Sequence, residues 1–287
     1  MKAIWSLLLL ALCDLLPAQS LPAGYLRPNF AEFAGLHEPV PTERVCYPFF
    51  ESLEQFGIAP PELIDGRFRL TNQIDQLLEA IQPTLNPRWL WVIDFPAAHF
   101  ELNREQVIAY NNVVVRGAGP GETVFHMREG TGNCFQILGQ LQGDRRFLVQ
   151  GNKGSRWIYV HPRLPDALPS GTVILLQRSA VAPVCNAAGI GQMVRVVGKQ
   201  GNFRLLDQSL NFDFRGQEDG ASAIELRQRQ FVGFENLTVD ASERDFDAAR
   251  SQASNFSFQF AYHCWLRGVE SIRPPYQHVR LDKTGHI

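Results

Sequence analysis

The chain has no marked excess of charge and, after its first residues, no long apolar run. Lysine and arginine number 27 against 29 aspartate and glutamate, so the formal net charge is -2. A nearly balanced chain with no dominant basic patch argues against nucleic acid as a partner. A membrane-spanning helix needs about 20 apolar residues, and no later stretch supplies them. We therefore expect neither a nucleic-acid partner nor a membrane span.

Familiar catalytic and metal-binding motifs are also absent. The sequence has five cysteines but no Cys-x-x-Cys or His-x-x-x-His spacing, which argues against a zinc site. It has no Gly-x-Ser-x-Gly elbow, and Gly117–Gly121 lacks the Lys-Ser/Thr ending of a phosphate-binding loop. We expect Cys134 and Cys264 to be buried thiols. Cys46 and Cys185 lie in loop-like sequence and are the better candidates for a disulfide.

The N-terminus carries a predicted export signal. Lys2 precedes the apolar run Ala3–Cys13, and Ala18–Ser20 offers a small-x-small cleavage site. A run of this length suits a signal peptide and is too short to cross a bilayer. We expect residues 1–20 to be a signal peptide, and the remaining chain to be secreted or periplasmic. We also expect that chain to be a monomer.

Prolines and apolar patterns divide the next part of the chain. Residues 21–69 contain seven prolines, each of which interrupts regular structure, so we expect an irregular extension. Ile74, Leu77, Leu78 and Ile81 then repeat at helical spacing. This pattern predicts a short helix whose apolar stripe caps one end of a β-stack.

Short strand-like runs separated by turns follow the helix. The region 141–221 is typical of an antiparallel insert, with a hairpin turn at Lys199–Asn202. Leu237 and Val269 occupy similar places 32 residues apart, as expected for one coil of a solenoid. We predict an all-β chain with a capping helix and first coils in 70–140, the insert in 141–221 and further coils in 222–287.

Several segments resemble pectate-lyase-like right-handed parallel β-helix proteins. Phe95–Leu102 is similar to the family's FPAG-x-Y-x-L strand, with Ala98 in place of the usual glycine. Val113–Thr123 resembles its v-i-x-G-x-G-x-x-x-T strand and turn, and Phe231–Asp240 and Cys264–Ile272 resemble later coils. The resemblance implies a secreted bacterial protein with three sheets per coil that acts on polysaccharides. Because no terminal cap is visible, we expect the chain to be an N-terminal portion of a longer solenoid.

The family includes lyases, hydrolases, epimerases and phage-type adhesins, so the fold leaves the activity open. We favour a lyase that cleaves an acidic polysaccharide by β-elimination over a hydrolase. The alternatives are a carbohydrate-binding or adhesin-type β-helix without catalysis, and an inactive portion of a larger enzyme. A lyase needs a cation to neutralise the sugar carboxylate and a base to remove the adjacent proton.

The last strand-like run supplies both kinds of group. Alternation places His278, Arg280 and Asp282 on one face of it, which is also the pattern of any solvated strand. The candidate catalytic residues are His278, Arg280 and Lys283. The candidate substrate-binding residues are Arg267, Trp265 and Asp282.

An acidic loop is the candidate metal site. Asp240, Asp245 and Asp247 offer the carboxylate oxygens that calcium prefers, and lyases of this family often use calcium. The spacing matches no known calcium loop, so a solvated surface loop is the alternative. Calcium is the only cofactor that we expect.

Overall fold

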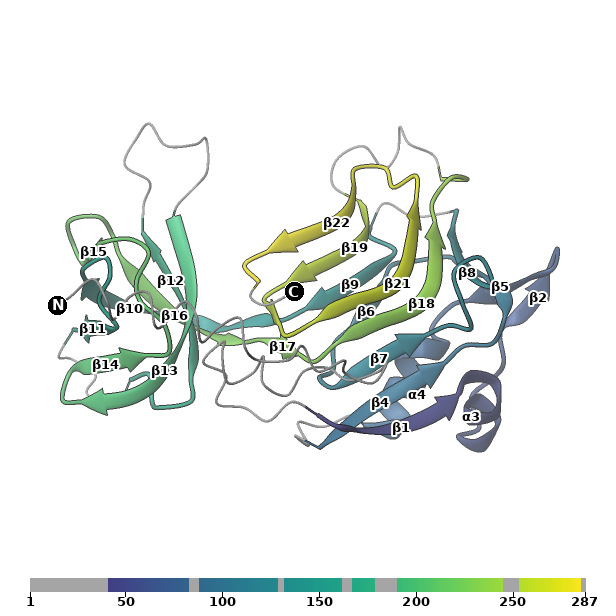
Figure 1. The fold of residues 1–287 in the computed structure, drawn as a ribbon, viewed down its shortest axis with the longest axis horizontal. Coiled ribbons are helices and arrows are strands. Elements are labelled where there is room, and N and C mark those ends of the chain that lie inside the picture. Colours follow the sequence, from purple (N-terminus) through teal and green to yellow (C-terminus); the bar gives the residue numbers. More distant parts are fainter. Residues whose placement is uncertain are drawn as a thin grey trace, which may run out of the picture. The chain divides into compact units, whose positions relative to one another are not determined.

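The computed structural model describes residues 41–82, 88–128, 132–161, 167–178, 190–244 and 253–284. These residues are mostly β-strand, with two helices (Figure 1). Within these ranges, no helix has the length and apolarity needed to span a bilayer.

Parallel strands from successive passes of the chain form the first sheet. The order is β1 (Glu43–Pro48), β4 (Trp89–Asp94), β7 (Val113–Arg116), the first half of β18 (Gly233–Asp240) and the first half of β21 (Trp265–Ile272). Strands that are far apart in sequence therefore lie side by side (Figure 1). This is the pairing that the short-strand rhythm predicts.

A second run of parallel pairs continues around the coil. β18 joins the two runs into one hydrogen-bonded sheet, and we call the runs the first and the second sheet. It contains β3 (Arg67–Leu70), β5 (Ala98–Leu102), β8 (Thr123–Met127) and the second half of β18. β2 (Glu62–Ile64) pairs antiparallel with β3 at the edge. Asn236 takes a positive φ of 53° and divides β18, so its first half pairs with β7 and its second half with β8. One strand thereby serves two faces of the coil.

The third sheet is also parallel. Its order is β6 (Gln106–Ile108), β9 (Phe135–Leu138), β19 (Ser254–Gln259) and β22 (Gln277–Asp282). The short strands β17 (Arg229–Gln230) and β20 (Ala261–Tyr262) form a further parallel pair. Leu237 pairs with Val269, which confirms the predicted spacing of 32 residues for one coil.

A column of phenylalanines fills the interior of the coils. Phe100, Phe125, Phe135, Phe234 and Phe256 are fully buried, and neighbouring rings lie 5.0 to 5.3 Å apart. Each contact of this kind adds about 0.5–1.5 kcal/mol beyond the area that it buries. The abundance of phenylalanine in the sequence therefore has a structural cause.

The predicted short helix is confirmed. α4 spans Gln73–Ile81, and Ile74, Leu77 and Leu78 are fully buried in the same core as the phenylalanines. Its apolar stripe is what the i, i+3, i+4 spacing predicts.

The prediction that residues 21–69 are irregular is wrong for the part that the structure describes. β1, α3 (Phe49–Gln55), β2 and β3 lie there, and Phe49 and Leu53 are fully buried. The prolines sit between these elements: Pro48 ends β1, and Pro60 and Pro61 precede β2. A proline at such a boundary disturbs no hydrogen-bonded ladder. Residues 21–40, and the predicted signal peptide, lie outside the described ranges.

The insert is a separate antiparallel sheet with its own core. Its order is β11-β14-β13-β12-β16-β10-β15, and a further pairing of β10 with β11 closes this path into a ring. Gln200 pairs with Phe203, which confirms the predicted hairpin. Its strands are β10 (Gln140–Gly151), β11 (Trp157–Val160), β12 (Val173–Arg178), β13 (Ile190–Gln200), β14 (Phe203–Leu206), β15 (Phe214–Arg215) and β16 (Ser222–Arg227).

Candidate functional site

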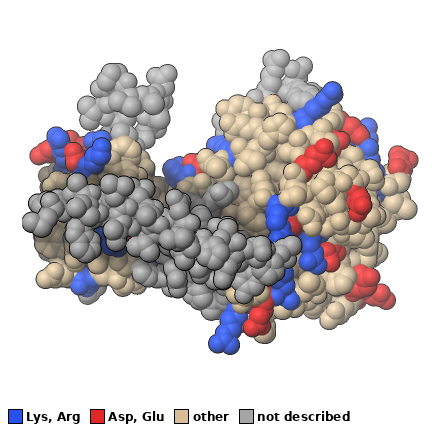
Figure 2. Space-filling model, in the orientation of Figure 1, with Lys and Arg blue, Asp and Glu red and all other residues tan. Residues whose placement is uncertain are grey.

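Charged side chains of both signs lie on the outer faces of the coils. On the face drawn in Figure 2, the described basic and acidic side chains are interspersed, and neither sign gathers into a large patch. Two groups of these side chains have enough contacts to be candidates for function. One lies on the first sheet and the other on the second.

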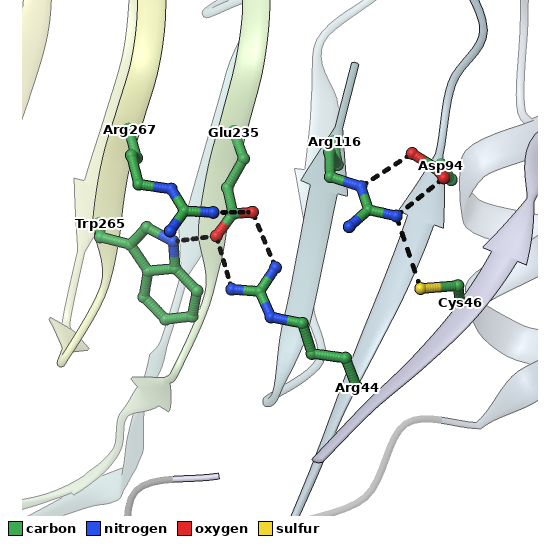
Figure 3. A network of polar contacts seen from close by, with 7 residues as sticks. All are labelled: Arg44, Cys46, Asp94, Arg116, Glu235, Trp265 and Arg267. Carbon is green, nitrogen blue, oxygen red and sulfur yellow. Dashed lines mark hydrogen bonds and ion pairs between the residues drawn. The ribbon is translucent and has the colours of Figure 1, made fainter. Parts of the chain in front are cut away.

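The first group contains a row of alternating charge. Asp94 of β4, Arg116 of β7, Glu235 of β18 and Arg267 of β21 stand in register on four neighbouring strands (Figure 3). Arg116 binds Asp94 through two hydrogen bonds of 2.9 and 2.8 Å, and this pair raises the pKa of Arg116. Opposite charges on adjacent strands stabilise such a ladder.

Glu235 is the centre of the row. Its side chain is fully buried and accepts hydrogen bonds from Arg44 at 2.8 and 2.9 Å, from Trp265 Nε1 at 2.9 Å and from Arg267 at 2.8 Å (Figure 3). Gly233 leaves room for the Trp265 indole, which an added Cβ would meet. We call Arg44, Glu235, Trp265 and Arg267 the Glu235 cluster.

The contacts of the Glu235 cluster favour the ionised form of the Glu235 carboxylate. Burial alone would raise the pKa of Glu235, but the hydrogen bonds from Arg44 and Trp265 and the charge of Arg267 lower it below its usual value. Glu235 therefore stays ionised and cannot serve as a proton donor. Arg267 and Trp265, which the sequence suggested for substrate binding, hydrogen-bond to this carboxylate, and their role in substrate binding remains a prediction.

The other predicted site residues lie on a different sheet. His278, Arg280 and Asp282 are on β22, the edge strand of the third sheet. His278 Nδ1 is 2.9 Å from Ser271 Oγ, and Lys283 binds Asp282 at 3.2 Å. The six predicted residues thus fall into two groups on two sheets, and the catalytic roles of the β22 group remain predictions.

The predicted calcium site is only partly within the described residues. Asp245 and Asp247 lie outside them, whereas Asp240 ends β18 and accepts a hydrogen bond from the Ser242 backbone at 2.8 Å. Where the chain is described, no group of three His, Cys, Asp or Glu side chains is placed to hold a metal ion. Calcium therefore remains a prediction from sequence.

The structure confirms part of what the sequence predicts for the cysteines. Cys134 and Cys264 are free thiols, as predicted, and burial raises the pKa of each to about 12. Cys46 is an exposed free thiol, 3.5 Å from an Arg116 nitrogen (Figure 3), so the structure gives it no disulfide. Cys185, its suggested partner, lies outside the described residues.

The second group of charged residues lies on the second sheet. Arg69, Glu101, His126 and Asp240 stand in register on β3, β5, β8 and β18. Arg69 Nε donates to Glu101 at 3.0 Å, and His126 Nδ1 lies 3.8 Å from Asp240 Oδ2. Four neighbouring coils thereby bring a guanidinium, two carboxylates and an imidazole into one line.

A second histidine extends this line to solvent. His99 is exposed, and its Nδ1 lies 2.8 Å from His126 Nε2, with the two rings stacked at 5.1 Å and 10°. The His126 side chain is 8 % exposed, and its Nδ1 has no hydrogen-bond partner among the described residues. We call Asp240, His126 and His99 the histidine relay.

The charge of Asp240 favours one tautomer of the histidine relay. A carboxylate facing His126 Nδ1 favours the proton on that nitrogen, so His126 Nε2 accepts from His99 Nδ1. His99 Nε2 then carries the lone pair and lies on the exposed ring. This arrangement gives an oriented base at the surface, supported by a buried imidazole and a carboxylate.

Two more side chains complete the surroundings of the relay. Arg67 binds Glu243 through hydrogen bonds of 2.9 and 2.6 Å. The bonds raise the pKa of Arg67 and lower that of Glu243. Burial lowers the pKa of His126, and the positive charge of Arg67 lowers it further. His126 is therefore neutral at neutral pH, as an acceptor in the relay must be.

Acid is expected to destabilise the protein through His126. Its pKa in the folded state lies below the ordinary value of 6.5, so the unfolded chain binds this proton more readily. The stability that depends on neutral His126 is present above pH 6.5 and is lost as the pH falls through the folded-state pKa. When the pH is lowered from 7 to about 5, we expect the free energy of unfolding to fall less in His126→Gln than in wild type. Urea denaturation at the two pH values measures both falls. Equal losses in the two proteins would contradict this assignment.

Sequence reasoning missed the histidine relay. His99 and His126 are 27 residues apart, and no local pattern connects them. The usable signal was the register of two successive coils, since Glu101 pairs with His126 and His99 with Val124. Aligning the two strands side by side would have brought both imidazoles together.

Comparison with known proteins identifies the fold. No family model and no curated protein matches the chain. The tailspike gp61 of Pseudomonas phage phi297 is 14 % identical, with a TM-score of 0.50 over 63 % of this chain and 29 % of the tailspike. The Gp54 tailspike of Acinetobacter baumannii bacteriophage AP22, solved with A. baumannii capsular saccharide, is 10 % identical, with a TM-score of 0.54 over 88 % and 40 %. The chain thus spans less than half the length of either protein, and its fold is similar to that of these phage tailspikes.

Proposed function

We propose that the protein binds an acidic polysaccharide and cleaves it by β-elimination, with His99 as the base. The observation that carries the proposal is the histidine relay, which ends on an exposed imidazole of β5, next to the strand β3 that carries Arg67 and Arg69. The substrate class is supported by the fold, since one similar tailspike was solved with a capsular saccharide. Right-handed coiling and export through residues 1–20 belong to the same proposal.

The proposed chemistry starts from a uronate residue of the polysaccharide. Arg69 uses Nε and Nη2 in its ion pair with Glu101, and a guanidinium has five N–H donors, so further donors can hold the sugar carboxylate. Neutralising that carboxylate makes the proton on the adjacent carbon more acidic.

His99 Nε2 then removes that proton. The bond between the β carbon and the glycosidic oxygen breaks, a carbon–carbon double bond forms, and the proton passes from His99 to the leaving oxygen. His126 and Asp240 act through His99 by fixing its ring and tautomer. They are therefore positioning residues rather than catalytic ones.

A panel of acidic polysaccharides tests the proposal. The full chain is incubated with polygalacturonate, alginate and hyaluronan, and with dextran as the uncharged control. With at least one acidic polymer, we expect unsaturated product, detected by ultraviolet absorbance, and a fall in viscosity. Dextran should give neither signal. Absence of both signals on every acidic polymer would contradict cleavage.

The second candidate function is binding without cleavage, as in an adhesin. It is favoured by the pairing of Arg67 with Glu243 and of Arg69 with Glu101, because a substrate must compete with these carboxylates. Retention on a polysaccharide without any product would support it.

Hydrolysis would give a third result, new reducing ends without unsaturation. Glu101 and Asp240 flank His126 on alternate strands, which places their Cα atoms about 9.6 Å apart. These two carboxylates would then be the pair to replace.

A further inference from the structure

The antiparallel insert contains a polar pocket of its own. The pocket has a volume of about 350 Å³, and its lining includes Gln150, Tyr159, His161, Arg215 and Glu218. Sites for small ligands start at about 300 Å³ and place a few polar groups around an apolar surface. Amide, imidazole, guanidinium and carboxylate groups together offer both donors and acceptors.

The loop that forms one wall of the pocket is held in place. The Asp219 carboxylate is nearly buried and accepts hydrogen bonds from the backbone of Arg215 at 3.1 Å and of Ala221 at 3.0 Å. Arg178 lies 3.7 Å from the same carboxylate, and Gly216 supplies the positive φ of 66° that the turn requires. The backbone that carries Arg215 and Glu218 is therefore ordered before any ligand arrives, which reduces the entropic cost of binding.

An aromatic surface adjoins the pocket. Trp157 and Tyr159 alternate with buried Ile158 on β11, and Tyr159 is the register partner of Phe203 on β14. The Tyr159 and Phe203 rings lie 5.3 Å apart, and Trp157 and Phe203 are 39 % and 48 % exposed. Rings held at the surface in this way bury large areas when a flat ligand covers them, at little cost in conformational entropy.

We propose that this part of the insert is a second polysaccharide-binding site, distinct from the histidine relay. A pyranose ring has apolar C–H faces and a rim of hydroxyl groups, so it needs both an aromatic platform and polar partners. Tyr159 belongs to both features, because it lines the pocket and packs against Phe203. The ligand class rests on the proposed function, but the site itself rests on contacts within the insert alone.

Affinity electrophoresis of the full chain in gels containing polygalacturonate, alginate or hyaluronan tests this site. We expect Trp157→Ala and Arg215→Ala each to weaken binding by about five- to tenfold, because both side chains are exposed at the site. Leu141→Ala, which removes an exposed apolar side chain from β10, is the matched control and should be retarded like wild type. Cleavage of a short oligosaccharide should be unchanged in Trp157→Ala.

The outcomes separate this inference from the proposed function. Wild-type retardation that survives in both Trp157→Ala and Arg215→Ala overturns the second site, even where unsaturated product forms. Loss of retardation in these variants without any product from wild type supports the second site and overturns cleavage. No retardation of wild type by any of the three polymers overturns the second site, and the product assay then decides cleavage separately.

Discussion

Replacement of Glu235 by alanine is expected to lower the free energy of unfolding by about 3–5 kcal/mol. The change leaves the guanidinium groups of Arg44 and Arg267, and the indole N–H of Trp265, without the carboxylate that they share. Removing one member of a buried ion pair costs far more than the pair itself contributes, because the remaining charge stays desolvated. Since Arg44 and Arg267 keep 26 % and 48 % side-chain exposure, we expect the lower end of the range.

Urea denaturation of the purified full chain measures this loss. Glu62→Ala is the matched control, because Glu62 is an exposed carboxylate on the edge strand β2. Its change should stay within about 0.5 kcal/mol of wild type. If Glu235→Ala and Glu62→Ala unfold at the same urea concentration, the cluster does not stabilise the coils.

Replacement of His99 by alanine is expected to lower the rate of polysaccharide cleavage by about 10²–10⁴-fold, the usual contribution of a general base. The side chain is exposed, so the variant should fold as wild type does. Retention on the polysaccharide should be unchanged, since the base contributes to the transition state rather than to binding. The rate of unsaturated product and the retention in affinity gels are the two measurements.

His278→Ala is the informative comparison for this variant. His278 is also an exposed imidazole, and it is one of the three catalytic candidates that the sequence suggested. A full loss of cleavage in His278→Ala, with His99→Ala fully active, would return the site to β22 and refute the role given to the relay. The opposite result would support the relay. Wild-type activity in both variants would exclude each of the two imidazoles as the base.

Most of the fold could be predicted because its signals are local. The stripe of Ile74, Leu77 and Leu78 predicts α4, and the region 141–221 forms the antiparallel insert that its sequence is typical of. The 32-residue spacing of Leu237 and Val269 is also a property that sequence displays directly. The strands β1 and β3 were missed because the prolines around them favoured an irregular segment, although β3 alternates arginine with Phe68 and Leu70 as a strand does.

The candidate site could not be predicted because its contacts are not local. Arg44 and Glu235 are 191 residues apart, and the histidines of the relay come from two coils. Parallel stacking joins side chains at equivalent places in successive coils, whereas sequence reasoning favoured the charges that gather on β22. A pattern along one strand cannot show which residues of other strands stand beside it.

The closure of the insert has a consequence for protein engineering. Its first strand, β10, pairs antiparallel with its last, β16, through Gln140 and Arg227, so the chain leaves the coils and returns to them at one point. Arg229 donates to the Leu138 carbonyl at 3.1 Å, which ties the two flanking segments together. Segments with adjacent ends are the ones that domain transplantation tolerates best. The whole insert could thus be replaced by a short turn. It could also be transplanted between the equivalent strands of another β-helix protein.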